Sequence, residues 1–140
     1  MVAKQRVLFL CTHNSARSQM AEGFLHASAG DRFEVASAGT EATRVHPLAI
    51  RAMEEVGISL AWHTSKTLDR FLTQPWDYVI TVCDSASERC PAFPAETRRI
   101  HWSLDDPSRA TGTEEERLKA FRRVRDEISG RIRAWLADAV

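Results

Sequence analysis

Short apolar runs alternate along the chain with segments of helical periodicity. The clearest run, RVLFL at residues 6–10, has the length of a strand and is apolar after its first residue, which suits burial on both faces of a sheet. Three further strand patterns follow at residues 33–36, 77–82 and 99–102. Strands that alternate with helices predict an α/β fold with a parallel sheet.

Three segments carry apolar residues at helical spacing. The first ends at Gly30, where a glycine cap is typical, and its periodic positions are Met20, Ala21, Phe24, Leu25 and Ser28. The second begins with Pro47 at the first helical position and ends at Gly57. In the third, Thr113 and Glu116 form a capping box, and one apolar stripe follows: Leu118, Phe121, Val124, Ile128, Ile132 and Trp135.

The remaining stretches are less regular. SAGT at residues 37–40 is predicted to be a turn, and one short helix is expected around residues 67–72. No repeat or linker divides the sequence, so residues 1–140 are predicted to form a single domain.

Composition excludes several classes of partner and compartment. The 140 residues suffice for one core, and 19 basic and 19 acidic side chains give zero net charge, so neither a nucleic acid nor a membrane is expected as a partner. The apolar run at residues 7–10 is too short for a secretory signal, which favours a cytoplasmic protein. There the cysteines at positions 11, 83 and 90 are expected as thiols unless disulfides belong to the chemistry.

Candidate chemistry gathers where the predicted strands end. Cys11 and Cys83 each follow a strand, and Asp105 and Asp106 come shortly after the fourth. Ligands of parallel α/β sheets bind beyond the carboxyl ends of the strands, so we expect a site at this edge.

The segment from Cys11 to Ser18 has the composition of an anion-binding loop. Its backbone N–H groups and the following helix N-terminus suit a tetrahedral oxyanion, and Arg17 adds a bidentate guanidinium. The same positive surroundings stabilise a thiolate at Cys11, which makes it a candidate nucleophile. Ser18 is placed to donate a hydrogen bond to this thiolate, and Asn14 to brace the loop.

Other interpretations of these residues are possible. A buried cysteine is usually a small hydrophobic residue, and a noncatalytic oxyanion or thiol sensor would need no turnover. A zinc site would use Cys11, His13, Cys83 and Cys90, but their spacing does not match usual zinc motifs and Arg17 would repel the cation. The other histidines are expected to be surface or packing residues: His26, His46, His63 and His101.

The motifs together resemble a known family. VLFLCTHNSARSQMAEGFL is similar to the phosphate-binding loop of the low-molecular-weight protein tyrosine phosphatase superfamily, and more closely to its thioredoxin-coupled arsenate reductase branch. The resemblance continues through SAGT, PLAIRAMEEVGI, HTSKTL, VITVCD, the Cys90–Pro91 pair and HWSLDDP. It implies a single-domain α/β fold with a four-stranded parallel sheet flanked by helices.

The resemblance also implies roles for individual residues. Cys11 would be the nucleophile, Arg17 the oxyanion ligand and Asp106 the general acid, with Asp105 as the alternative acid. The oxyanion would be bound, and the loop supported, by Thr12, His13, Asn14, Ser15, Ala16 and Ser18. His13 stands where many relatives have glycine, so the entrance is expected to be narrower or gated.

The activity implied is reduction of arsenate to arsenite for arsenic detoxification, without a cofactor or metal. Cys83 and Cys90 would form disulfides in turn with Cys11 and with each other, and thioredoxin would reduce the last one. If residues 84–89 are helical, the two cysteines are about 10 Å apart, farther than the roughly 7 Å a disulfide spans, so oxidation is expected to unwind this segment.

A phosphatase acting on phosphate monoesters is the alternative enzyme. Its nucleophile, arginine and acid are the same. An aryl phosphate, however, calls for an aromatic residue just after the Asp-Pro pair, and here Ser108 and Arg109 follow Pro107. This departure favours the reductase.

Overall fold

The fold is built on one parallel sheet. The computed structural model describes residues 4–84, 93–94 and 96–139. Its strands are β1 (Gln5–Cys11), β2 (Phe33–Gly39), β3 (Tyr78–Thr81) and β4 (Arg98–His101), in the order β2-β1-β3-β4 with every pair parallel. The predicted α/β class with a four-stranded parallel sheet is therefore confirmed.

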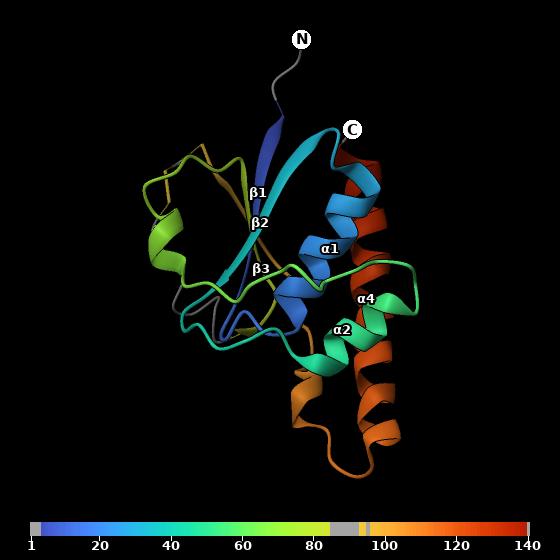
Figure 1. Cartoon of the computed structure of the whole chain (residues 1–140). Coiled ribbons are helices and arrows are strands. Elements are labelled where there is room, and N and C mark those ends of the chain that lie inside the picture. The colour runs from blue at the N-terminus through green and yellow to red at the C-terminus, as the bar shows by residue number, and fades with distance from the viewer. Residues whose placement is uncertain (1–3, 85–92, 95, 140) are drawn as a thin grey trace.

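The helical elements lie on the two sides of this sheet. In Figure 1, α1 (Arg17–Ala29), α2 (Pro47–Glu54) and α4 (Glu114–Ala139) lie together on one side. The short 3₁₀ helix η1 (Leu68–Phe71) lies on the other, and a second one, η2 (Pro107–Arg109), follows β4. The short helix predicted around residues 67–72 is thus present as η1.

The core explains why the first strand is apolar from Val7 onward. β1 is hydrogen-bonded on both edges, and residues 7–10 are at most 2% exposed. The predicted stripe of α4 is buried in the same core from residue 118 to residue 132, where α4 packs on α1 and α2, while Trp135 is partly buried against Phe33 and Tyr78. In the described part of the chain, no helix is long and apolar enough to cross a membrane.

Helix ends agree with the sequence in position but not always in geometry. Thr113 and Glu116 form the capping box, with the Glu116 N–H donating to the threonine hydroxyl at 3.2 Å. Gly57 follows α2 with φ +80°, a conformation that favours glycine. Gly30 ends α1 with φ −62°, so the left-handed cap expected of a terminal glycine does not form there.

The second strand is longer than predicted. Residues 37–39 were assigned to a turn, but they pair with β1 as far as Cys11 opposite Gly39. Side-chain periodicity cannot detect this extension, because Ser37 and Gly39 are typical turn residues and Ala38 is small. A Cβ atom at Gly39 would lie 2.6 Å from the Thr12 carbonyl oxygen and 2.7 Å from the Asn14 nitrogen. The missing side chain therefore lets β2 approach the loop that follows β1.

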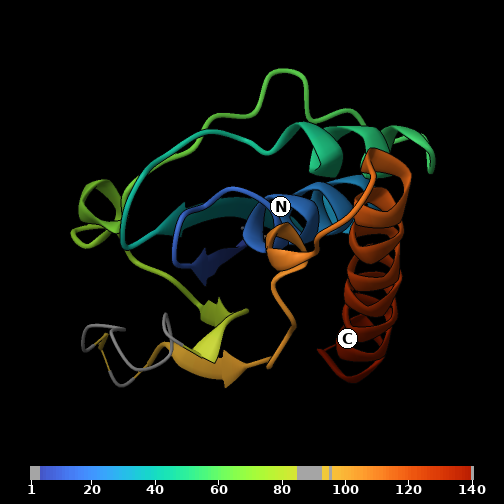
Figure 2. The same ribbon diagram turned by 90° about the horizontal axis from the view of Figure 1, so that it is seen from below.

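All four strands point their carboxyl ends toward the lower end of the molecule in Figure 1. Figure 2 views that end and shows the segment after β1 between the segment leading to α2 and the turn of η2. The loops that carry the candidate chemistry are thus neighbours, as the sequence predicted.

Candidate active site

The loop between β1 and α1 is held in shape by Asn14. This residue has a left-handed backbone (φ +49°) and a fully buried side chain. Its amide nitrogen donates to the Ser18 and Ser37 hydroxyls at 2.8 and 2.9 Å. Its amide oxygen accepts from the Lys66 N–H at 2.8 Å and from Gln19 at 2.9 Å. One side chain therefore fixes the loop to α1, β2 and the segment before η1.

Cys11 lies at the base of this loop and is 3% exposed. Its sulfur is 2.9 Å from the Ser18 hydroxyl and accepts a hydrogen bond from the Asn14 N–H at 3.2 Å. The asparagine amide already donates to the Ser18 oxygen, which leaves the serine proton available for the sulfur. Both neighbours of the sulfur can therefore donate a hydrogen bond to it.

Arg17, the first residue of α1, crosses the site toward the segment after β4. Its guanidinium donates to the Leu104 carbonyl oxygen at 3.0 Å and lies 3.6 Å from a carboxylate oxygen of Asp106. Cys11, Arg17 and Asp106 line one cavity of about 210 Å³. The rest of its lining is small or polar: His13, Ser15, Ala16, Thr43, His46 and Ser108.

Asp106 is the N-cap of η2, and its carboxylate therefore has different neighbours from that of Asp105. Its carboxylate accepts hydrogen bonds from the Ser108 N–H at 3.0 Å and hydroxyl at 2.6 Å. Burial alone would raise the pKa of Asp106, but these bonds and the Arg17 charge outweigh it and hold the pKa below its usual value. Asp105 instead lies 3.2 Å from Arg123 of α4 and does not line the Cys11 cavity.

Cys83 approaches the same loop from the end of β3. Its sulfur is 3.3 Å from the hydroxyl of Thr12, the residue after Cys11, and it is 3% exposed. A second cavity, of about 680 Å³, is lined by Thr12, Cys83, Arg17 and Asp106 among others. Two thiols therefore meet at one loop. Cys90 and residues 85–89 of the segment predicted to unwind lie outside the described residues, which omit 85–92.

His13 turns its side chain to the rim of the site. Its ring is half exposed and lies 3.4 Å from Glu41 in the segment after β2. Its carbonyl oxygen accepts from the Ser65 and Thr43 hydroxyls at 2.9 and 3.3 Å. The loop entrance is therefore bordered by residues 41–43.

Sequence reasoning missed several residues that shape the site. His46 was expected to be a surface or packing residue, and its ring does pack on Phe121, but the residue also lines the Cys11 cavity. The available signal was its position directly before Pro47, which marks the N-cap of a helix that starts at the functional edge. No sequence motif marks Ser37 or Gln19 as site residues. Both hydrogen-bond to Asn14, which lies between them in the fold, and Ser37 also donates to Glu22.

Within the residues that the structure describes, no group of three or more His, Cys, Asp or Glu side chains is arranged to hold a metal ion. The polar groups around Cys11 are instead N–H donors, a guanidinium and hydroxyls. Such a set suits an oxyanion.

A known protein family matches almost the entire chain. The model for the low molecular weight phosphotyrosine protein phosphatases matches residues 6–140. The chain belongs to this family. Membership accounts for the position of the loop between the first strand and first helix of this low molecular weight phosphatase fold.

Its similar proteins within the family include arsenate reductases. The arsenate reductase of Halalkalibacterium halodurans is 50% identical over 132 residues, covering 94% of this chain and 95% of that protein. A solved arsenate reductase in the phosphate binding state is 36% identical with a TM-score of 0.79, covering 96% and 98% of the two chains. The Corynebacterium glutamicum thioredoxin-dependent arsenate reductase is 31% identical with a TM-score of 0.75, covering 96% of this chain and 61% of that one. The resemblance stated from the sequence motifs is confirmed.

Proposed function

We propose that this protein reduces arsenate to arsenite through three cysteines, and that thioredoxin restores the thiols. The observation that carries the proposal is the second buried thiol, Cys83, which contacts the residue following Cys11. A phosphatase of this family needs only the nucleophile, the arginine and the acid. Reduction of arsenic needs two electrons as well, and a neighbouring thiol is their source.

Arsenate binds in the loop as a tetrahedral oxyanion. The loop N–H groups, the N-terminus of α1 and the guanidinium of Arg17 hold its oxygens above the Cys11 sulfur. The sulfur attacks arsenic, one As–OH bond breaks, and the hydroxyl leaves as water after receiving a proton. Arsenic remains at oxidation state +5 in the resulting cysteinyl arsenate.

Asp106 supplies this proton. The pKa of Asp106 is low while Arg17 lies beside it. A bound dianionic arsenate changes these surroundings in two ways. The dianion draws the guanidinium to its own oxygens and repels the negative carboxylate, so the pKa of Asp106 rises when substrate is bound. The carboxyl group then carries the proton at the place where the leaving hydroxyl departs.

The redox step follows at the second thiol. Cys83, as the thiolate, attacks the Cys11 sulfur, a disulfide forms, and the electron pair of the S–As bond stays on arsenic, which leaves as arsenite. Thr12 holds the Cys83 sulfur beside this loop through its hydroxyl. Cys90 then attacks Cys83, which releases the Cys11 thiolate and leaves a Cys83–Cys90 disulfide.

A dithiol protein must reduce that last disulfide in every cycle. Thioredoxin fits the requirement, and the similar Corynebacterium glutamicum enzyme is thioredoxin-dependent. Such a cycle needs a reducing compartment, so we infer that the protein works in the cytoplasm.

The absence of an aromatic wall supports the reductase against an aryl phosphatase. Among the described residues that line the Cys11 cavity, there is no Phe, Tyr or Trp to pack on a substrate ring. Thr43 and Ser108 occupy the walls, and these side chains suit a small hydrated oxyanion.

A coupled assay tests the proposal. Arsenate, thioredoxin, thioredoxin reductase and NADPH are mixed with the protein, and NADPH oxidation is followed beside hydrolysis of an aryl phosphate. We expect arsenate-dependent oxidation that Cys83→Ser abolishes. Aryl phosphate turnover that Cys83→Ser leaves intact, with no arsenate-dependent oxidation, would instead identify a phosphatase.

A further inference from the structure

His46 is fixed to the substrate loop and to the start of α2. Its backbone N–H donates to the Ser15 carbonyl oxygen at 2.9 Å. Its ring nitrogen Nδ1 accepts a hydrogen bond from the Leu48 N–H at 3.1 Å, which caps the helix. The ring also packs on Phe121 of α4, with centroids 4.6 Å apart. Contacts on three sides therefore leave the imidazole little freedom to rotate.

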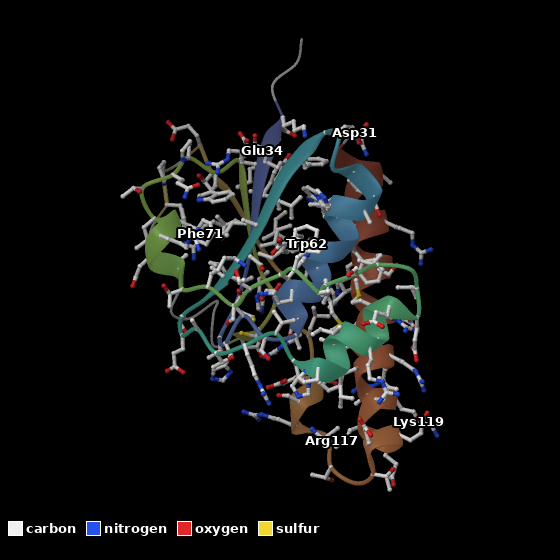
Figure 3. All side chains as sticks on the ribbon, in the orientation of Figure 1. Asp31, Glu34, Trp62, Phe71, Arg117 and Lys119 are labelled. Atoms are coloured by element: carbon white, nitrogen blue, oxygen red, sulfur yellow. The ribbon has the colours of Figure 1, made fainter. Side chains whose placement is uncertain are left out.

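The helix cap determines where the imidazole carries its proton. Because Nδ1 accepts from the Leu48 N–H, the proton of the neutral ring is on Nε2. In a doubly protonated ring Nδ1 would also carry a proton, and its N–H would point at the N–H of Leu48. Burial lowers the pKa of His46, the charges of Arg117 and Arg44 lower it further, and Asp106 opposes them. Figure 3 shows Arg117 near the start of α4.

The Nε2–H edge lies on the side of the ring away from the helix cap. His46 lines the cavity that Cys11, Arg17 and Asp106 share. In the described part of the chain, the only hydrogen bond of the His46 ring is the one at Nδ1. A fixed neutral donor therefore stands at the wall of an oxyanion cavity with its N–H uncommitted.

We propose that His46 binds the substrate, donating its Nε2–H to the arsenate oxygen that points out of the loop beside Asp106. This inference rests on the proposed function. The loop amides and Arg17 hold the inner oxygens. His46 holds the outer oxygen, which is the one that leaves as the hydroxyl. A neutral N–H also stabilises negative charge on that oxygen without competing with Asp106 for the proton.

The contact favours free oxyanions over esters. In a phosphate monoester the outward oxygen carries carbon, so it is a poorer acceptor and its substituent lies where the imidazole stands. His46 therefore selects small unsubstituted tetrahedral oxyanions, which adds to the effect of the missing aromatic wall.

Two variants separate the helix cap from the substrate contact. His46→Asn keeps a preferred N-cap side chain but has no donor that reaches the cavity, whereas His46→Ala removes both. Inorganic phosphate serves as the probe because it has the shape of arsenate and does not oxidise thiols. Calorimetric titration of phosphate and the thermal midpoint are measured for the two variants and the wild type.

We expect His46→Asn to keep the wild-type thermal midpoint and to bind phosphate about 3- to 10-fold more weakly, the effect of one lost hydrogen bond. His46→Ala should lose stability as well. In the arsenate assay, His46→Asn should raise KM for arsenate and lower the preference for arsenate over an aryl phosphate. In ¹⁵N NMR of the wild-type imidazole, Nε2 should be the protonated nitrogen and should shift when phosphate is added.

Wild-type phosphate affinity in a folded His46→Asn variant would overturn the inference and leave the ring as a helix cap only. An unprotonated Nε2, or one that phosphate does not shift, would overturn it even if neither variant folds. Failure of the wild type itself to bind phosphate would remove the oxyanion site on which the proposed function rests, and the inference with it. The two failures are therefore distinguishable.

Discussion

Asn14 is the residue on which the loop geometry most depends. It combines a left-handed backbone with four buried side-chain hydrogen bonds to Ser18, Ser37, Gln19 and the Lys66 N–H. Asn14→Ala should lower the free energy of unfolding by at least about 1–3 kcal/mol, since the buried partners are left unsatisfied. Chemical denaturation measures this change.

Asn14→Gly is the matched control for the backbone. Glycine adopts φ +49° without strain but makes none of the side-chain bonds. It should therefore be less destabilised than Asn14→Ala by about 1 kcal/mol. An alanine variant with wild-type stability would show that the amide does not brace the loop.

The two adjacent carboxylates provide a second prediction at the residue scale. Asp106→Asn should slow formation of the arsenate adduct by roughly 10²- to 10⁴-fold, the usual range for loss of a general acid. Asp105→Asn should have a small effect, because Asp105 lies against Arg123 and away from the Cys11 cavity. Single-turnover arsenite release measures both, and the reverse ranking would move the role to Asp105.

Individual site residues differ in how far the sequence reveals them. Cys11 and Arg17 stand in one short loop whose composition and spacing predicted that they meet, whereas the role of Asp106 was reached only through the family resemblance. His46 was missed because a histidine before a proline signals only the N-cap of a helix, and its place at the cavity arises only when α2 is packed against the loop. Adjacent aspartates were left ambiguous, since only the turn of η2 separates their directions.

At the scale of elements, the close approach of β2 to the loop is the sharpest constraint. A methyl group at Gly39 would lie 2.6 Å from the Thr12 carbonyl oxygen and 2.7 Å from the Asn14 nitrogen, both backbone atoms that cannot rotate away. Gly39→Ala should therefore displace the loop and reduce both arsenate reduction and stability. The coupled assay and the thermal midpoint record these losses.

Gly130 of α4 is the matched control for this substitution. No atom lies within 4 Å of a Cβ at this position, and alanine is a better helix former by about 1 kcal/mol. Gly130→Ala should be stabilising and fully active. Equal activity of the two alanine variants would contradict the role given to the approach of β2.

Element types were easier to predict than their ends. β1 and α4 follow from their apolar patterns, because burial on both faces or on one stripe leaves a periodic signal. The extension of β2 through residues 37–39 leaves none, since its residues are small and its partner is the end of β1. Tertiary pairing decided that boundary.

At the scale of the whole molecule, two histidines couple folding to pH. Burial, reinforced by Arg117 and Arg44 and opposed by Asp106, lowers the pKa of His46 below 6.5. Burial also lowers the pKa of His63, where Lys66 and His26 add to the effect and Glu22 opposes it. Both rings are therefore neutral in the folded protein at a pH where the unfolded chain already binds protons.

The stability should consequently fall as the pH decreases from about 6.5 toward 5, because protons bind the unfolded state more tightly. Asp84, Asp106 and Glu55 have lowered pKa values and stay ionised in this window. The stability that these carboxylates provide is therefore lost only at lower pH. Denaturation at pH 7.5 and pH 5.5 measures this loss of stability. The loss should be smaller in His46→Asn and in His63→Gln than in the wild type. A stability that rises on acidification through this window would contradict the neutral rings.

The measurement that tests the central claim most directly is one turnover by the Cys90→Ser variant. The reduced variant is mixed with excess arsenate without thioredoxin, arsenite is quantified, and disulfides are mapped by mass spectrometry. Transfer of the electron pair from Cys11 and Cys83 to arsenic predicts one equivalent of arsenite and a Cys11–Cys83 disulfide. No arsenite, or arsenite without that disulfide, would contradict the account.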